Sequence, residues 1–527
     1  MRPDLTTLWQ MIEARGRADF IVAPRKRFSY RALAKQIEHV CGAFDKAGLR
    51  AGDRVTIALE DESLASASFL AAMLDGLVPV MLSPDAAAER CAAIAERLEA
   101  RLVLDDANPP PVPGGFLKRS RSASTVARRP KLPNLDDDAL AYVLFTSGTT
   151  AEPRGVQVTH KNLFSQLQTL IRLFDYKPGA RIFNATPLAH TDGLVQGPLL
   201  AAVSGATLVR PGLFEVSDLE SWLDFLRSET ATHMITNPTL LTILLRMAQE
   251  VDYFDPAQFQ GIVSTGGILT QEICDGVESR FGVRVWNVYG MTETVSDALY
   301  AGDHPEMGAR GTIGRPIDCT ARIAGGLSEG ELELFGDNIV PGYWRDANQT
   351  ASSRTSDSWF RTGDIVRARP DGSFDFLGRT KTTINQGAVT IHPEEINEAL
   401  MSHAQVLEVV TVGLPDAEFE EIAISGIVLA QPVDEAELFT HCASRLEPLK
   451  RPKRIVALES IPKMPSGKVD VARLKQIVQG ATVTTATGKT VHDDTSLEAR
   501  VLSIAASVFG AAIDDLDLNS STDTVPG

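Results

Sequence analysis

Apolar residues follow two kinds of pattern in the first part of the chain. In residues 31–46 they recur at Leu33, Ile37, Val40 and Phe44, which is the spacing of an amphipathic helix. Short uninterrupted apolar runs lie between such segments and indicate buried strands. The predicted order is helix 31–46, strand 54–59, helix 63–74, strand 78–82, helix 86–100 and strand 101–104. Strands that alternate with helices predict parallel sheets with helical crossovers, and therefore an α/β fold.

The pattern changes in the second half of the chain. Strands at 331–335 and 374–377 indicate a β-rich region. After 378–381 the pattern predicts a small α+β unit of about 100 residues. Its elements are helix 393–401, strands 406–412 and 423–429, helix 434–446 and strand 454–458. We therefore expect a large N-terminal domain, 1–378, of mixed, parallel-rich sheets with helices and a β-rich subdomain, and then a small, mobile α+β C-terminal domain, 379–478.

The last part of the chain has a different composition. Residues 479–494 are rich in Thr, Gly and Ala and are typical of a linker. Residues 497–509 have the pattern of one amphipathic helix. One helix cannot bury its apolar face without a partner. Residues 495–527 are therefore predicted to be the truncated start of a further helical domain.

Charge and cysteine usage exclude some classes of protein. The net charge of −17 is spread along the chain, so no nucleic-acid partner is expected, because phosphate backbones would be repelled. The five cysteines never form a C-x-x-C pair, which fits a reducing compartment without a zinc site. Residues 1–17 lack the apolar stretch of a signal peptide. The most apolar window, 63–82, is broken by Asp75, Gly76 and Pro79, so we expect no membrane span and a cytoplasmic location.

A run of small hydroxyl residues follows an apolar strand at 139–145. The run consists of Thr146, Ser147, Gly148, Thr149 and Thr150. Its backbone N–H groups and hydroxyls, together with the cation of Arg154, would form a cradle for an anion at the end of the strand. The Walker pattern is absent, which disfavours a P-loop NTPase. A solvated Ser/Thr turn would also explain such a run, and other segments of the chain decide between the two interpretations.

The segment 146–155 resembles the phosphate loop of the adenylate-forming superfamily, which contains acyl- and aryl-CoA ligases, luciferases and the adenylation domains of nonribosomal peptide synthetases. The further motifs that resemble those of this superfamily are Asn287-Val-Tyr-Gly-Met-Thr-Glu-Thr294, Gly330-Glu-Leu-Glu-Leu334 with Pro341-Gly-Tyr343, Phe360-Arg-Thr-Gly-Asp364, Gly378-Arg-Thr-Lys381 and Pro465-Ser-Gly-Lys468. They occur in the order of the family and span residues 10–478. The resemblance implies attack of a carboxylate on the α-phosphorus of ATP, which gives an acyl-adenylate and pyrophosphate.

The resemblance also implies a site for ATP and Mg²⁺. Glu293 would hold the metal and Thr292 would donate to the α-phosphate, in keeping with the preference of Mg²⁺ for carboxylate and phosphate oxygens. The other implied ATP contacts are Tyr289 stacked on the adenine, Asn287 along its edge, Asp364 on the ribose hydroxyls with Arg379 nearby, the run 146–150 with Arg154 on the phosphates, and Gly266 and Gly267 where the backbone approaches the nucleotide. The alternatives are an exposed loop acid for Glu293 and a core tyrosine for Tyr289.

Two lysines have implied roles in the small domain. Lys468 would be the catalytic cation, aimed by a tight loop at the carboxylate and the bridging oxygen. The alternative is an ordinary surface lysine, such as Lys463. Lys381 matches the hinge residue about which the small domain would swing for thioester formation. The chain departs from the family at Ala151 and Ala388, where the family has Gly, and at Arg154, where it has Lys.

Alignment of the motifs implies a pocket for the acid. The implied residues are His190, Asp192, Thr265, Trp286 and Val288. Asp192 falls where amino-acid-activating members keep an aspartate for the α-ammonium group. A cap on the following helix is an equally good explanation of Asp192. Trp286 favours a short or flat acid over a long acyl chain.

Residues 497–527 resemble the first helix and loop of an acyl carrier domain, without the serine that bears phosphopantetheine. An unrelated tail helix is the alternative. We therefore expect a ligase that activates a small, amino or aryl acid with ATP and transfers it to the phosphopantetheine thiol of a carrier domain, in cis or in trans. The alternatives are a ligase that uses free CoA and a nucleotide-binding module that has lost catalysis. The sequence does not specify an oligomeric state.

Overall fold

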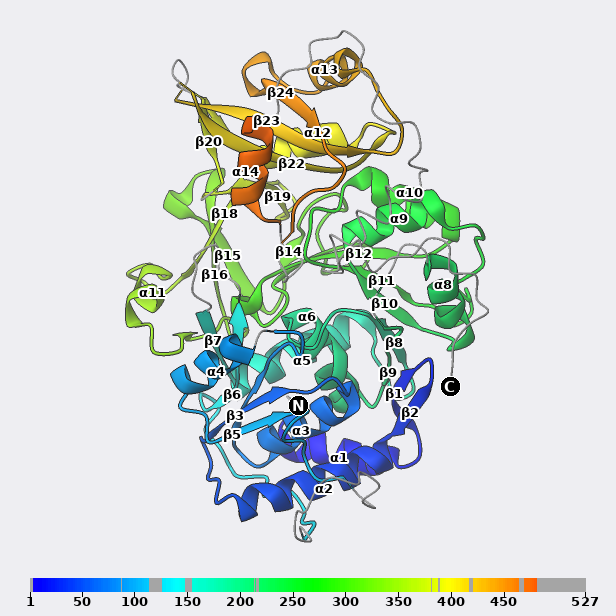
Figure 1. Cartoon of the computed structure of the whole chain (residues 1–527), viewed down its shortest axis with the longest axis vertical. Helices are drawn as coiled ribbons and strands as arrows, with labels where there is room; N and C mark the ends of the chain where they lie inside the picture. The colour runs from blue at the N-terminus through cyan, green and yellow to red at the C-terminus, as the bar shows by residue number, and fades with distance from the viewer. Residues whose placement is uncertain are drawn as a thin grey trace.

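Figure 1 shows the computed structural model of the chain, in which a small C-terminal unit lies at one end of a larger N-terminal part. The structure describes residues 3–86, 88–112, 126–146, 154–212, 214, 218–380, 382–386, 389–416, 420–463 and 469–480. The fold is α/β with several sheets, as predicted. Apart from residues 479 and 480, the predicted linker 479–494 lies outside the described residues, as does the predicted carrier segment 495–527, so both stay predictions.

The first elements of the chain include a three-stranded parallel sheet with its crossover helices. Their bounds are α1 Leu5–Arg15, β1 Asp19–Ala23, β2 Lys26–Ser29, α2 Tyr30–Lys46, β3 Arg54–Ala58, α3 Glu62–Leu74, β4 Val78–Met81, α4 Ala88–Arg97 and β5 Leu102–Asp105. The sheet has the order β4-β3-β5, and both pairs are parallel. Asp61 begins α3 by accepting hydrogen bonds from the backbone N–H groups of Ser63 and Leu64, as an N-cap does. Helix α4 is shorter at both ends than the predicted helix 86–100.

A nine-stranded sheet forms the centre of the N-terminal part. Its order is β14-β13-β12-β11-β10-β8-β9-β1-β2, and the strands from β12 to β1 are parallel. The further strands are β8 Arg181–Asn184, β9 Thr207–Val209, β10 His233–Thr236, β11 Gly261–Ser264, β12 Val285–Tyr289, β13 Leu299–Ala301 and β14 Arg315–Pro316. The helices of this region are α5 His160–Phe174, α6 Thr191–Leu194, a π-helix Val195–Leu199, α7 Leu200–Ser204, α8 Leu219–Ser228, α9 Pro238–Met247 and α10 Gln271–Phe281. The carboxyl ends of parallel strands share one edge of the sheet, which is where ligands bind in such folds.

Two antiparallel sheets complete the N-terminal part. One has the order β17-β7-β6, with β6 Leu140–Thr146, β7 Arg154–Thr159 and β17 Gly342–Tyr343. The other is the predicted β-rich region, with the order β15-β16-β18-β19 and the bounds β15 Cys319–Ile323, β16 Glu329–Gly336, β18 Phe360–Ala368 and β19 Phe374–Arg379. Helix α11, Ala347–Ser352, follows β17. This second sheet leads directly into the C-terminal unit (Figure 1).

The C-terminal unit has its own sheet and its own core. The elements are β20 Ile384–Gln386, β21 Val389–Ile391, α12 Pro393–Met401, β22 Val406–Asp416, β23 Glu420–Leu429, α13 Glu435–Ala443, β24 Arg454–Ala457 and α14 Val471–Gly480. Its sheet has the order β21-β20-β23-β22, with β24 parallel to β23. Ile396, Leu400 and Ile427 are at most 1% exposed and belong to one cluster. The unit is therefore the α+β domain that the sequence predicts.

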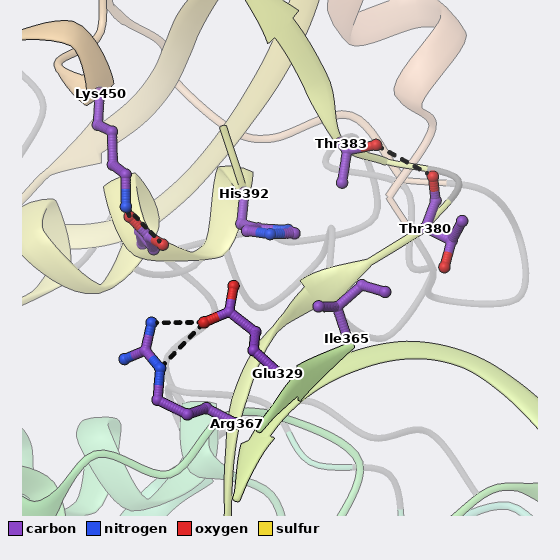
Figure 2. Close-up of a pocket in the computed structure, with 8 residues that line it drawn as sticks. Glu329, Ile365, Arg367, Thr380, Thr383, His392 and Lys450 are labelled. Carbon is purple, nitrogen blue, oxygen red and sulfur yellow. Dashed lines mark hydrogen bonds and ion pairs between the residues drawn. The ribbon is translucent and has the colours of Figure 1, made fainter. Parts of the chain in front are cut away.

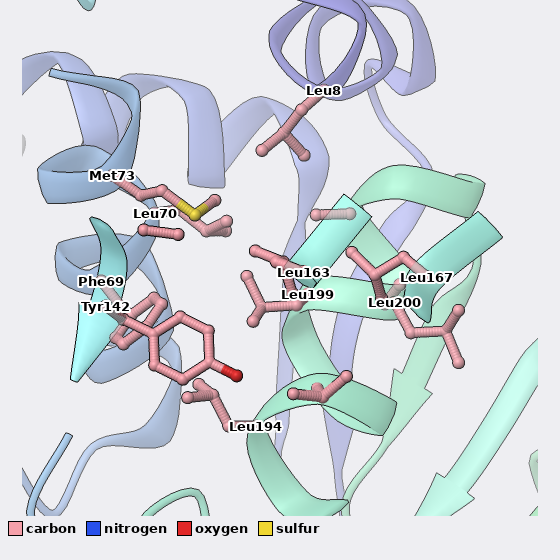
Figure 3. Packing of buried hydrophobic residues seen from close by; sticks show 14 of the residues in the cluster. Leu8, Phe69, Leu70, Met73, Tyr142, Leu163, Leu167, Leu194, Leu199 and Leu200 are labelled. Carbon is pink, nitrogen blue, oxygen red and sulfur yellow. The ribbon is translucent and has the colours of Figure 1, made fainter. Parts of the chain in front are cut away.

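The largest hydrophobic core lies between the first helices and the central sheet. Figure 3 shows side chains of α1, α3 and α5 converging with those of α6 and α7. Tyr142 on β6 meets Phe69 on α3 edge to face, at 5.7 Å between ring centroids. Helix α3 is buried along almost its whole length, because it packs on several sides. Within the described part of the chain, no helix combines the length and the hydropathy that a bilayer crossing requires.

Candidate active site

The predicted phosphate loop connects two hydrogen-bonded strands. Thr146 ends β6 and pairs with Arg154, the first residue of β7. Tyr343 on β17 pairs with Val156, which lies on β7 as Arg154 does. The positive charge of Arg154 acts on the Tyr343 hydroxyl. The structure therefore brings Arg154 next to a motif that lies far along the chain. Ser147, Gly148, Thr149, Thr150 and Ala151 lie outside the described residues.

Glu293 is held by this same tyrosine. It lies in a short 3-10 turn, Thr292–Thr294, directly after β12. The Tyr343 hydroxyl donates to Oε1 of Glu293 at 2.8 Å, and the backbone N–H of Val340 donates to the Glu293 carbonyl. Burial, and then the Glu293 charge, raise the pKa of Tyr343, so the hydroxyl keeps its proton as a donor. The second carboxylate oxygen can take a hard cation, because Mg²⁺ binds single carboxylates together with phosphate oxygens.

Three predicted nucleotide residues form one polar chain. The Tyr289 hydroxyl donates to Oδ2 of Asp364 at 2.6 Å, and Nε of Arg379 lies 3.0 Å from Oδ1 of Asp364. Asp364 and Arg379 face each other across β18 and β19. Asp364 is 1% exposed, whereas the Arg379 side chain is 60% exposed. Burial raises the pKa of Asp364 and Arg379 lowers it. Each carboxylate oxygen keeps a lone pair that can accept from a further hydroxyl.

The ends of β11 and β12 bring the other predicted nucleotide residues together. Asn287 pairs with Ser264 across these parallel strands, so it lies beside the segment that contains Gly266 and Gly267. The Asn287 amide donates to the Thr312 carbonyl at 2.9 Å. Its Oδ1 is buried and has no hydrogen-bond partner within the described residues, which leaves an acceptor for a ligand. Gly266 has φ +77°, a conformation that favours glycine.

The predicted acid-binding residues divide into two groups. His190 is the N-cap of α6, and its ring accepts from the backbone N–H of Asp192. The Asp192 carboxylate instead accepts from the hydroxyls of Thr265 at 3.3 Å and Ser296 at 2.8 Å. The helix-cap explanation of Asp192 is therefore wrong. His190, Asp192 and Thr265 lie together next to the glycines at the end of β11.

Trp286 and Val288 lie on the core side of β12. The Trp286 ring packs on Phe174 at 5.1 Å between centroids, and its indole nitrogen donates to Asp303 at 2.7 Å. Val288 belongs to the same large core cluster. These contacts give both residues a structural role, and their part in acid binding stays a prediction.

The expected catalytic lysine and hinge lie outside the described residues, but the residues around them are described. Lys463 and Val469, which precede and follow residues 464–468 in the chain, form an antiparallel bridge. Lys463 is not the surface lysine that the sequence suggested. Its side chain is 7% exposed and pairs with Glu408 at 2.7 Å. Lys381 and Ala388 also lie outside the described residues.

A pocket of about 310 Å³ lies beside the expected hinge (Figure 2). It is lined from the β-rich sheet by Glu329, Ile365 and Arg367, and from the hinge and the small domain by Thr380, Thr383, His392, Glu395 and Lys450. Thr380 and Thr383 flank the position of Lys381. The hinge prediction therefore falls at the boundary between the two domains.

Several polar side chains at this site were given no role by the sequence. Tyr343 was part of a quoted motif but had no assigned role. Ser296 and Asp297 lie shortly after the Thr292–Thr294 turn and had no role either. Gln196 lies in the π-helix after α6 and donates to both Ser296 and Asp297. The signal for Tyr343 was its place in a motif, whereas the position of Gln196 depends on tertiary contacts alone.

The parallel sheet, the separate C-terminal domain and the polar residues at the strand ends define an α/β nucleotide-binding enzyme of two domains. Residues 8–344 match the profile of the AMP-binding enzyme family, and residues 395–468 match that of the AMP-binding enzyme C-terminal domain. The chain belongs to this family and is an adenylate-forming ligase. Among the described residues, no group of three or more His, Cys, Asp or Glu side chains could hold a metal ion.

Comparisons with individual proteins agree with this family. The chain is 34% identical to a sulfoacetate–CoA ligase of Cupriavidus necator, over 65% of this chain and 68% of the relative. It is 27% identical to a 4-hydroxybenzoate–CoA/benzoate–CoA ligase of Rhodopseudomonas palustris, over 89% of this chain and 92% of the relative. The crystal structure of ATP-bound MatB from Rhodopseudomonas palustris superposes with a TM-score of 0.76 at 23% identity, over 91% of this chain and 99% of that chain. The structural likeness supports the fold.

Proposed function

We propose that this chain activates a carboxylic acid with ATP and transfers the acyl group to the thiol of CoA. In the first step, an oxygen of the acid attacks the α-phosphorus, and the bond from that phosphorus to pyrophosphate breaks. In the second step, the thiol sulfur attacks the acyl carbon, the bond from that carbon to AMP breaks, and the thiol proton leaves to solvent. The polar chain of Tyr289, Asp364 and Arg379, together with the Glu293–Tyr343 pair, carries the proposal.

The charges required by the first step have candidates in this site. Both reactants are anions, so fixed donors and cations must stabilise the charge that develops on the phosphoryl oxygens. Arg154 supplies one cation, and Lys468 is proposed to supply another from the small domain. Glu293 would hold Mg²⁺, which neutralises phosphate charge when it is bound. Tyr343 fixes the orientation of the Glu293 carboxylate through their hydrogen bond.

The nucleotide base and sugar have their own candidates. Tyr289 offers an aromatic face, on which a base can stack, while its hydroxyl holds Asp364. Asp364 would accept from the ribose hydroxyls, and Arg379 balances its charge. The free Oδ1 of Asn287 would accept from the exocyclic amine of adenine.

CoA is the preferred acceptor because the relatives reported above are named as CoA ligases. A carrier domain is the second candidate, because residues 497–527 resemble the start of one. In that case the phosphopantetheine thiol would take the place of CoA. The chemistry of the thioester step is the same for both thiols.

The test is ATP–pyrophosphate exchange with a panel of amino, aryl and short aliphatic acids, followed by intact-mass detection of the thioester with CoA or with a carrier domain. We expect exchange with at least one acid and its loss in Lys468→Ala. Lys177→Ala is the control, because Lys177 is 70% exposed and pairs only locally, with Asp175. Unchanged exchange in Lys468→Ala would refute the role of that lysine. A thioester with the carrier but not with CoA would favour the second acceptor.

A further inference from the structure

Two carboxylates lie close together next to the predicted acid-binding residues His190 and Thr265. Asp192 is 5% exposed and Asp297 is fully buried. The Ser296 hydroxyl oxygen lies 2.8 Å from Oδ1 of Asp192 and 2.9 Å from Oδ2 of Asp297. The three oxygens therefore form a row at hydrogen-bond distances, with the serine in the middle.

Such a row requires two protons, one for each contact. Ser296 has only one hydroxyl proton, so it can donate to only one of the two aspartates. The Gln196 amide donates to Ser296 at 2.8 Å and to Asp297 at 3.0 Å, which uses both of its protons. The proton for the second of the two contacts must therefore be carried by the carboxyl group of one of the two aspartates.

Asp297 is the aspartate that the surroundings favour as this acid. Its Oδ1 is buried and has no hydrogen-bond partner within the described residues, and a bare ionised oxygen is far more costly to bury than a neutral carbonyl. Asp192, by contrast, also accepts from Thr265 and lies 3.6 Å from the His190 ring. Burial, followed by the Asp192 charge, raises the pKa of Asp297 well above its usual value. Among the described residues, the other titratable groups that act on Asp297 are the hydroxyls of Tyr176 and Tyr300, which are neutral and do not favour its ionised form.

The backbone is held in an unusual conformation at this place. Val295 has φ +55° and Ser296 has φ +99°, which are rare for residues with a side chain and especially for a β-branched one. Asn338 donates to the Asp297 carbonyl at 3.1 Å, and a Cβ at Gly290 would meet the Ser296 carbonyl oxygen at 1.7 Å. Strained backbone of this kind persists where the surroundings fix it, and it is common at functional sites.

We propose that Asp297 is held in its protonated form and that, through Ser296, it positions the carboxylate of Asp192 beside the predicted acid-binding residues. The proposal rests on the proposed function and narrows its substrate class. A substrate that places an ammonium or neutral polar group next to Asp192 would fit this site. A second anionic group in the same place would face Asp192 and be repelled.

This substrate class differs from that named for some relatives. Sulfoacetate, named for one of them, carries a second anionic group. We expect amino acids to support exchange at least about tenfold better than dicarboxylates or sulfonates of equal length, because juxtaposed like charges are strongly unfavourable. Asp192→Asn should remove most of this difference, and a neutral acid of equal length serves as the internal reference.

The protonation state can be measured in the resting chain without any substrate. Infrared spectra of the full chain with isotope-labelled aspartate should contain the carbonyl band of a protonated aspartic acid at neutral pH. Asp297→Asn, which has the shape of the protonated acid, should keep the fold and remove this band. Asp364→Asn is the matched control, because burial also raises the pKa of Asp364. A band that persists in Asp297→Asn, or that is lost only in Asp364→Asn, overturns the proposal.

The two measurements separate the proposal from the proposed function. If the band disappears in Asp297→Asn but no acid supports ATP–pyrophosphate exchange, the protonated state of Asp297 is confirmed and the ligase function is refuted. If exchange is best with dicarboxylates, the ligase function stands and the substrate class falls. Asp297→Ala should impair amino-acid exchange more than Asp297→Asn, because only Asn can still contact Ser296. If Asp297→Ala and Asp297→Asn change KM and kcat to the same extent, Asp297 acts only through packing and the proposal is refuted.

Discussion

Arg379→Ala tests how the structure stabilises the buried carboxylate of Asp364. In the wild type, Arg379 approaches Asp364 at 3.0 Å from an exposed position, and Tyr289 donates to the other oxygen. Without the guanidinium, Asp364 has the tyrosine hydroxyl as its remaining partner in this polar chain. We therefore expect a loss of stability that exceeds the value of an ordinary surface ion pair.

The magnitude follows from the burial of each partner. An exposed ion pair contributes less than about 1 kcal/mol, whereas removal of one partner of a fully buried pair costs about 3–5 kcal/mol. Asp364 is 1% exposed and the Arg379 side chain is 60% exposed, so water can replace part of the lost contact. We expect a loss of about 2 kcal/mol in the free energy of unfolding at neutral pH.

The loss should depend on pH. Burial raises the folded-state pKa of Asp364, and Arg379 lowers it, so this pKa rises further in Arg379→Ala. A carboxyl group whose pKa is higher in the folded state than in the unfolded state destabilises the fold at pH values above its folded-state pKa. This penalty decreases as the pH falls through the folded-state pKa and is absent below the unfolded-state pKa. The loss should therefore be larger near about pH 8 than near about pH 5.

The assay is urea unfolding of Arg379→Ala, Asp364→Asn and the double variant at these two pH values. In the Asp364→Asn background, Arg379→Ala should cost less than about 0.5 kcal/mol, because no charge remains to be balanced. Arg367→Ala is the control, because the Arg367–Glu329 pair is about half exposed on both sides. An equal loss at both pH values, or an equal loss in the Asn background, would refute the reasoning.

Three further predictions concern other parts of the chain. Arg246→Ala removes the hydrogen bond of 2.8 Å to the Val406 carbonyl, which joins the two domains. Amide hydrogen exchange at the start of β22, measured by mass spectrometry, should become about tenfold faster, and an unchanged exchange rate would contradict this. Lys463→Met leaves Glu408 buried without its cation and should lower the free energy of unfolding by about 3 kcal/mol. Adding Glu408→Gln removes the unpaired charge and should restore the melting temperature. A melting temperature that stays low would show that this charge is not the cause. His160 is buried, which lowers its pKa to about 4. As the pH drops from about 6.5 toward 4, the unfolded state binds the proton first, so the free energy of unfolding falls. In His160→Phe this fall should be smaller by about 2 kcal/mol at about pH 5, and a pH profile identical to that of the wild type would count against this assignment.

The elements were predictable where local signals were strong. Helix α2 follows from its apolar spacing and from Ser29, which accepts from the Ala32 N–H at its start. The β-rich sheet and the C-terminal domain follow in the same way, from short apolar runs and a change of pattern near Gly378. Helix α4 is shorter than predicted, because helix ends depend on local hydrogen bonds that apolar spacing does not show.

The site was predictable in its residues but not in its contacts. Tyr289 and Asp364 were both identified, but they are 75 positions apart, and no periodicity reveals that one donates to the other. The same holds for Tyr343 and Glu293, which are 50 positions apart. Lys463 was misjudged because its burial depends on Glu408, whose strand reaches it only in the folded domain.

The pocket between the domains suggests how the small domain can move. Its two ion pairs do not cross the boundary, since Arg367 binds Glu329 within the β-rich sheet and Lys450 binds Glu395 within the C-terminal domain (Figure 2).

Rotation about residues 380–383 would therefore open the pocket without separating either pair of charges. Other contacts do cross the boundary: Arg246 donates to the Val406 carbonyl, and Leu407 packs on the second core of the large domain. Helix α12 also lies against β19, but neither ion pair of the pocket has to be separated or desolvated in such a rotation. The charge arrangement at this boundary thus favours a domain that can change its orientation between the two proposed steps.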